Sequence, residues 1–329
     1  MFVSIDTKLT KNGHRSSPPF INPLSHSPIL SLTHSLINPF SYLRTGLAEK
    51  IKILPLSSGA QHMLVATFYF AIMNIFIKAV SHLPTMEIVF FRCGISLLLC
   101  MYQLHVMKID WKGSNRKLLI LRGAFGTTAL YLYFITIARM PLATAVAIQY
   151  LSPIFTTILA IFVLKEKVRP ITWLFFLISF SGVLVMKGVD DNIELSYLLV
   201  GILSAIVSGF AYITIRTLKA KEDPLVVVFH FQLVGTLTGL TFSTVNFTMP
   251  HGLDWIYLIL VGIFTQLGQV NLTKALQQDK VANVSIINYT GVIYAIASGF
   301  LIFGEHYGVG TIGGILLVIL GVLLSMIYR

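Results

Sequence analysis

Long apolar runs alternate with short polar breaks from residue 60 to the end of the chain. Each run is close to the roughly 20 residues that an α-helix needs to cross about 30 Å of hydrocarbon. In hydrocarbon every backbone N–H and C=O must be paired internally, and the runs lack the period-two alternation of barrel strands. The pattern therefore predicts an all-α integral membrane protein with ten transmembrane helices, over residues 63–80, 86–107, 117–138, 142–164, 171–187, 196–216, 225–245, 254–273, 281–303 and 308–328.

The segment 1–57 differs from the rest, because it is rich in Ser, Pro, His and Asn. Repeated prolines disfavour helix, so we expect a disordered, low-complexity cytoplasmic tail. It lacks the apolar stretch and small-residue cleavage site of a secretory signal. Acidic residues are rare in it, as in an organellar transit peptide; a dispensable tail, or translation that starts at Met63, is the alternative.

Composition agrees with a membrane protein. Of 329 residues, 55% are hydrophobic and only 11% are charged, with a mean hydropathy of +0.81. A soluble domain carries about 25% charged residues, so this surface must face lipid. Two cysteines, Cys93 and Cys100, lie seven residues apart on one apolar run, and they indicate no disulfide framework.

The basic residues predict the orientation of the helices. With the N-terminus in the cytoplasm, the inner segments hold 19 of the 24 Lys and Arg residues, and the outer segments hold only Arg139 and Lys187. This bias follows the positive-inside rule for an even number of spans, so both termini are expected in the cytoplasm. The same bias accounts for the net charge of +11, so no nucleic-acid partner is expected. The plasma membrane is the expected location.

The chain contains an internal repeat. A shift of 139 residues aligns 121–184 with 260–323 without a gap, and it pairs Tyr150 with Tyr289 and Glu166 with Glu305. The shift spans five predicted helices, an odd number, so the two halves must be inverted relative to each other. We therefore expect a first repeat over 60–187 (helices 1–5) and a second over 196–328 (helices 6–10). Inverted repeats are typical of secondary transporters.

Several stretches resemble a known family. They are Pro141–Ala145, Leu151–Phe155 and Leu164–Lys167, their counterpart from Ala282 to Glu305, and Glu87–Arg92. Together they resemble the EamA domain of the drug/metabolite transporter superfamily, over about 60–328. The resemblance implies a ten-helix 5+5 inverted fold with a central substrate cavity, lined mainly by helices 3, 4, 8 and 9. It does not name the cargo.

Polar side chains within the runs are the candidates for a substrate site, because a buried amide without a partner costs roughly 2–7 kcal/mol. Small and polar residues line one face of helix 4, and the repeat maps them onto a similar face of helix 9. Cavity lining and close helix packing with interhelical hydrogen bonds both explain this pattern. The uncharged candidates are Gln149, Tyr150, Asn288, Tyr289, Gln266, Gln269, Thr127, Tyr131 and Asn74.

Arg92 is the charged candidate. It lies six residues into the second helix, roughly 9 Å deep, where a charge needs a partner or a wet cavity. It would bind an anionic substrate or brace an outer gate. Lys78 and Arg122 lie nearer to helix ends, where we expect their side chains to snorkel to the interface.

Two acids and one histidine have structural interpretations. For Glu166 and Glu305, at helix ends, capping and ion pairing are favoured over proton coupling. His230, alone on an apolar face, is expected to be a structural hydrogen-bond donor.

The function that best fits these features is secondary transport of a small polar metabolite or drug-like solute by alternating access. The sequence carries no metalloprotease or Cys-x-x-Cys pattern and no phosphate-binding loop, so we expect no enzyme activity, no cofactor and no metal site. The expected partners are the lipid bilayer and a small-molecule substrate. A coupling H⁺ or exchanged solute, the direction of transport and the oligomeric state stay open. The alternative is a membrane interaction or structural protein that has a transporter-like fold but does not transport.

Overall fold

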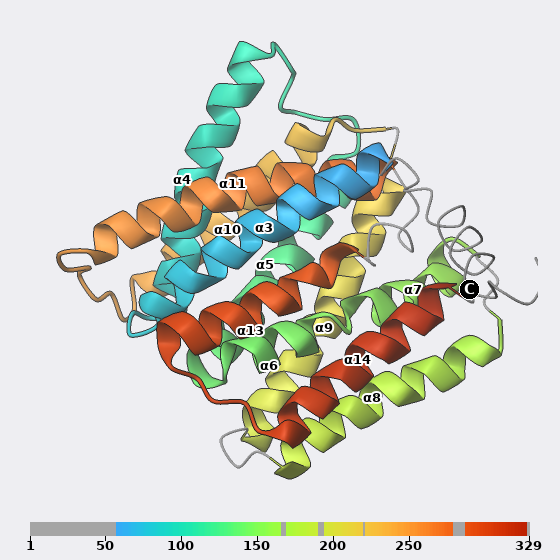
Figure 1. The fold of residues 1–329 in the computed structure, drawn as a ribbon. Coiled ribbons are helices and arrows are strands. Elements are labelled where there is room, and N and C mark those ends of the chain that lie inside the picture. Colours follow the sequence, from blue (N-terminus) through green and yellow to red (C-terminus); the bar gives the residue numbers. More distant parts are fainter. Residues whose placement is uncertain (1–56, 166–168, 190–193, 220, 279–286, 328–329) are drawn as a thin grey trace, which may run out of the picture. The chain divides into compact units, whose positions relative to one another are not determined.

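The computed structural model describes residues 57–165, 169–189, 194–219, 221–278 and 287–327. Within these ranges all regular elements are helices, and eight spans are long and apolar enough to cross a membrane (Figure 1). They are α3 (Ser58–Ala79), α4 (Thr85–Val106), α5 (Arg116–Arg139), α6 with α7 (Leu142–Val163), α8 (Ile171–Val189), α9 (Leu195–Thr217), α10 (Pro224–Ser243) and α11 (Asp254–Gln278).

Two shorter apolar helices complete the described bundle, α13 (Thr290–Phe303) and α14 (Val309–Ile327). The all-helical membrane fold predicted from the apolar runs is confirmed. The ninth and tenth runs fall on these two shorter helices. The tail up to residue 56 and the beginning of the 281–303 run lie outside the described residues.

The fourth predicted run is interrupted, which the sequence analysis did not anticipate. Its two parts are α6 (Leu142–Gln149) and α7 (Ser152–Val163). Pro153 lacks an N–H, so it cannot continue the hydrogen-bond ladder back to Gln149. The Ile154 N–H turns to the Leu151 carbonyl instead, at 2.9 Å, and this leaves the Tyr150 carbonyl without its helical partner.

Helices from the two halves of the chain lie side by side in pairs: α3 with α11, α4 with α10, α5 with α9, and α8 with α14 (Figure 1). The α8–α14 contact is reciprocal. A methyl group on Gly182 would lie 2.7 Å from the Val318 nitrogen, and one on Gly321 would lie 2.6 Å from the Ser179 nitrogen. Each residue of the second contact lies 139 positions from its counterpart in the first, so glycine permits the same close approach twice.

Buried carboxylates connect the loops at the two ends of the bundle. Glu222, before α10, accepts hydrogen bonds from the backbone N–H groups of Ser114 and Asn115, each at 2.6 Å. Glu87, in the first turn of α4, accepts one from the Thr248 N–H at 3.0 Å. The loop before one helix of the α4–α10 pair is thus tied to the loop after the other helix.

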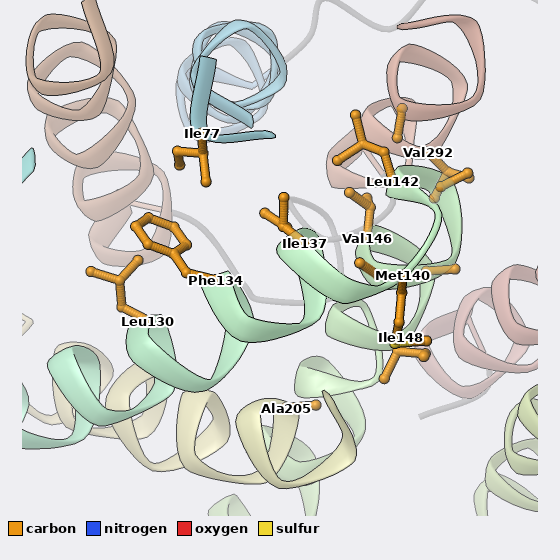
Figure 2. Packing of buried hydrophobic residues seen from close by; sticks show 14 of the residues in the cluster. Ile77, Leu130, Phe134, Ile137, Met140, Leu142, Val146, Ile148, Ala205 and Val292 are labelled. Atoms are coloured by element: carbon orange, nitrogen blue, oxygen red, sulfur yellow. The ribbon is translucent and has the colours of Figure 1, made fainter. Parts of the chain in front are cut away.

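The apolar core packs around α5 and α6. In Figure 2, Ile77, Phe134, Val146 and Val292 point toward one another from α3, α5, α6 and α13. Lipid tails are as apolar as these side chains, so van der Waals packing stabilises this contact more than exclusion of water does. The packing fixes α5 and the end of α6 around the polar site described next.

Candidate functional site

A cavity of about 130 Å³ lies among these helices. It is bounded by α3, α4, α5, α6, α9, α10, α11 and the residues that lead into α13, whereas α8 and α14 contribute nothing. Apolar and aromatic side chains form most of its wall. Its polar lining consists of Thr67, Asn74, Arg92, Arg122, Tyr133, Gln149, Tyr150, Ser208, Tyr212, Gln269 and Asn288.

The structure places six of the ten predicted site residues on this cavity. They are Asn74, Arg92, Gln149, Tyr150, Gln269 and Asn288. Asn74 donates to the Tyr133 hydroxyl over 3.1 Å, and its buried Oδ1 has no hydrogen-bond partner. The buried Oε1 of Gln269 has none either. These two amides therefore keep hydrogen-bonding capacity at the cavity.

The other four predicted residues do not line the cavity. Gln266 is buried between α4 and α11, where it accepts from Ser96 and donates to Gln103, each at 2.8 Å. Thr127 is buried, and a methyl group on Gly235 of α10 would lie 3.3 Å from its hydroxyl. Tyr131 is half-buried, and the Tyr289 ring packs behind Tyr150. The sequence predicted that Gln266 and Gln269 share one face of their helix, but the cavity reaches only Gln269.

The two repeat-related amides at the cavity differ in their bonding. Gln149 donates to Ser208 over 2.7 Å and accepts from Ser204 over 2.9 Å, so it joins α6 to α9. Asn288 accepts one bond, from Thr67 of α3 at 3.1 Å. Gln149 thus combines cavity lining with interhelical bonding, the two interpretations that the sequence left open.

Arg122 was wrongly predicted to snorkel to the interface. Its side chain is buried and lines the cavity, with its guanidinium carbon 4.4 Å from the centre of the Phe231 ring. The guanidinium lies against Gly126, one turn further along α5, where any side chain would displace it. This glycine four residues after the arginine is the sequence signal that could have identified Arg122.

Lys78 does not snorkel either. It forms an ion pair with Glu305 and donates to the Met140 carbonyl at 2.9 Å. Glu305 also accepts from the Leu142 N–H at 2.8 Å, which caps the N-terminus of α6, and from Tyr307 at 2.5 Å. Burial, and then the bond to Glu305, raise the pKa of Tyr307, so its hydroxyl stays a donor. We call these four residues, Lys78, Leu142, Glu305 and Tyr307, the Glu305 cluster.

The ion pairing and capping predicted for Glu305 are confirmed, whereas Glu166 lies outside the described residues. The structural role predicted for His230 is also confirmed, because its Nδ1 lies 2.9 Å from the Val226 carbonyl oxygen. Among the described residues, no cluster of three or more His, Cys, Asp or Glu side chains is arranged to hold a metal ion.

Comparisons with known proteins agree with this architecture. The model of the EamA-like transporter family matches the chain twice, over residues 57–187 and 195–327. The pseudopaline exporter CntI of Pseudomonas aeruginosa is 32% identical over 274 residues, covering 82% of this chain and 96% of that protein. Human solute carrier family 35 member G1 is 29% identical, with 79% and 76% of the two chains covered.

Further matches extend the range of relatives and the structural comparison. The S-adenosylmethionine uptake transporter of Rickettsia prowazekii is 27% identical and covers 73% of this chain and 82% of its own. A solved crystal structure superposes with a TM-score of 0.64 at 15% identity, covering 83% of this chain and 98% of the other, so it supports the fold alone. The chain belongs to the EamA-like transporter family of the drug/metabolite transporter superfamily.

Proposed function

We propose that this protein is a secondary transporter that moves a small polar solute across a membrane by alternating access. The observation that carries the proposal is the position of the cavity, where Gln149–Tyr150 of one half meet Asn288 of the other. The α6–α7 helix is interrupted at Tyr150, and α13 begins just after the equivalent residue, Tyr289. Interrupted helices that meet at a polar site are the typical binding-site arrangement of transporters built from inverted repeats.

The proposal includes ten spans in two inverted five-helix repeats, over 60–187 and 196–328. The reciprocal contacts of α8 with α14 support it, because a two-fold axis requires that each contact occur twice with its partners exchanged. The helix pairing also fits, since α3 with α11 and α9 with α5 are equivalent pairs under the 139-residue shift.

The positive-inside bias places both termini in the cytoplasm in this proposal. The loops that contain Ser114 and Glu222 then both face the cytoplasm, in agreement with the hydrogen bond between them. The Glu305 cluster then lies at the outer end, where it ties α3, α6 and the loop after α13 together. Its release is the step that we expect to open the cavity to the outside.

The relatives support transport without fixing the cargo. One is named an exporter of pseudopaline and another an uptake transporter of S-adenosylmethionine, so cargo and direction both vary among proteins similar to this chain. A plasma-membrane location and coupling to H⁺ or to an exchanged solute stay predictions.

Counterflow into proteoliposomes tests the proposal. Liposomes that contain the purified protein are preloaded with one unlabelled solute at a time, and uptake of the same radiolabelled solute is measured against protein-free liposomes. We expect a transient accumulation of at least one small polar solute that disappears in Asn288→Leu. If a folded, monodisperse protein exchanges no solute across amino acids, carboxylates and nucleosides, the non-transporting alternative is favoured instead.

A further inference from the structure

Two arginine side chains share the wall of the cavity without a carboxylate partner. Arg92 of α4 and Arg122 of α5 are 1% and 3% exposed, and both line the cavity. Their guanidinium carbons lie 5.5 and 4.4 Å from the centre of the same Phe231 ring. The two charges are therefore at most about 10 Å apart.

The acidic residues of the described chain are engaged elsewhere. Its two ion pairs join Lys78 to Glu305 and His82 to Asp254. The buried carboxylates of Glu87 and Glu222 accept hydrogen bonds from backbone amides of the end loops.

Three guanidinium nitrogens keep unused hydrogen-bonding capacity. Nε of Arg92, and Nε and Nη1 of Arg122, are buried and have no hydrogen-bond partner. The one side-chain hydrogen bond that Arg92 forms goes to the weak acceptor Cys93, at 3.4 Å. Contacts with the faces of Phe134 and Phe231 stabilise these cations without neutralising them.

Two uncompensated positive charges at membrane depth are costly unless a counter-charge or water accompanies them. We propose that the cargo supplies this counter-charge: the transported solute is a small organic anion whose carboxylate binds between Arg92 and Arg122. The planar guanidinium donates two parallel hydrogen bonds to a carboxylate, a geometry that an ammonium cannot reproduce. The inference rests on the proposed transport function and names the substrate class of the same cavity.

The rest of the wall fits an acid of modest size. About 130 Å³ accommodates a small organic acid but not a nucleotide-sized anion. The unpaired Oδ1 of Asn74 and Oε1 of Gln269 are acceptors, so they favour a cargo that also carries a hydroxyl or amino donor. Phe231 and Tyr212 lie beside the arginines and limit access of water to the bound carboxylate.

Binding in detergent tests the inference without requiring transport. Thermal unfolding of the full-length purified protein is followed with malate, succinate and inorganic phosphate, and with the uncharged counterparts malamide and succinamide. We expect a concentration-dependent rise of the melting temperature with malate that exceeds the rise with succinate, and no rise with either diamide. Equal stabilisation by malate and malamide would overturn the inference, and stabilisation by phosphate alone would overturn its carboxylate assignment.

Substitution of the arginines identifies the binding groups. In Arg92→Gln and Arg122→Gln the malate affinity should fall about tenfold or more, since each variant removes a charge-assisted hydrogen bond, and Arg→Lys should restore part of it. Arg139→Gln, which changes an exposed arginine outside the cavity, is the matched control and should leave the affinity unchanged. Without ligand, removal of a buried unpaired charge should leave the melting temperature unchanged or raise it. An unchanged malate affinity in both variants contradicts the inference.

If neither Gln variant folds, the comparison of malate with malamide on the unmodified protein decides the question. Binding of malate without counterflow would reject the proposed transport but keep the site. Counterflow of neutral solutes alone would reject the anionic cargo but keep the transport.

Discussion

The Tyr289 hydroxyl donates a hydrogen bond to the backbone carbonyl of Tyr150 over 3.3 Å, and the two rings meet edge to face with centroids 5.2 Å apart. These tyrosines lie 139 residues apart and occupy equivalent positions in the internal repeat. The carbonyl that accepts the bond is the one left without a helical partner at the break before Pro153. One half of the chain thus completes the interrupted backbone of the other, next to the cavity.

Tyr289→Phe should lower the free energy of unfolding by roughly 1–3 kcal/mol, because a buried carbonyl loses its donor while the ring packing is retained. Thermal unfolding in detergent measures the change. Tyr102→Phe, at an exposed position on α4, is the matched control and should have little effect. If both variants are equally stable, the bond between Tyr289 and Tyr150 does not stabilise the break.

Gly291 is expected to tolerate no side chain, because a methyl group there would overlap the Tyr150 hydroxyl. Gly291→Ala should displace that tyrosine into the cavity and reduce counterflow several-fold. Adding Tyr150→Phe removes the overlapping oxygen and should restore part of the activity. Gly313→Ala, on an open face of α14, should be neutral or slightly stabilising, since Ala favours helix by about 1 kcal/mol over Gly. Full activity in Gly291→Ala would show that the position of Tyr150 does not matter.

Gln149→Leu and Asn288→Leu should separate interhelical bonding from cavity lining. Gln149 forms two bonds to α9, so its loss should cost roughly 1–2 kcal/mol of stability, whereas Asn288 loses a single bond of about 0.6 kcal/mol. Both variants should lose transport. The melting temperature and counterflow of each variant are compared, and normal transport in a destabilised Gln149→Leu would assign that residue to packing alone.

Cysteine labels test the orientation of the bundle. A membrane-impermeant thiol reagent should modify Ser114→Cys and Lys219→Cys only from the cytoplasmic side, and His251→Cys only from outside. The unmodified protein serves as the control, because its Cys93 and Cys100 are buried. Labelling of Ser114→Cys and Lys219→Cys from opposite sides would contradict the inverted repeat.

The extent of the helices could be predicted from the sequence because the thickness of a bilayer sets the length of an apolar run. The break at Tyr150 was missed because the apolar run continues through it, although Pro153 signals an interrupted hydrogen-bond ladder. Arg122 was missed because its distance from the start of the run does not reveal which way the side chain turns. Its burial depends on Gly126 and on Phe231 of another helix.

Six of the ten site residues could be placed on the cavity because polar groups deep in apolar runs must face partners or water. The same rule does not separate the two outcomes, which is why Gln266 was also selected. Its partners, Ser96 and Gln103, come from a helix whose contact with α11 could not be inferred from hydropathy. Ser208 and Tyr212 were not selected, since single hydroxyl groups on an apolar helix carry little signal.

The central claim is that one cavity is reached alternately from the two sides of the membrane. The measurement is the rate at which Asn288→Cys is modified by an impermeant thiol reagent, added first to one side and then to the other in oriented proteoliposomes. The account predicts reactivity from both sides, and a several-fold faster reaction from outside when Glu305→Gln removes the ion pair to Lys78. Reactivity from a single side, unchanged by Glu305→Gln, would contradict alternating access.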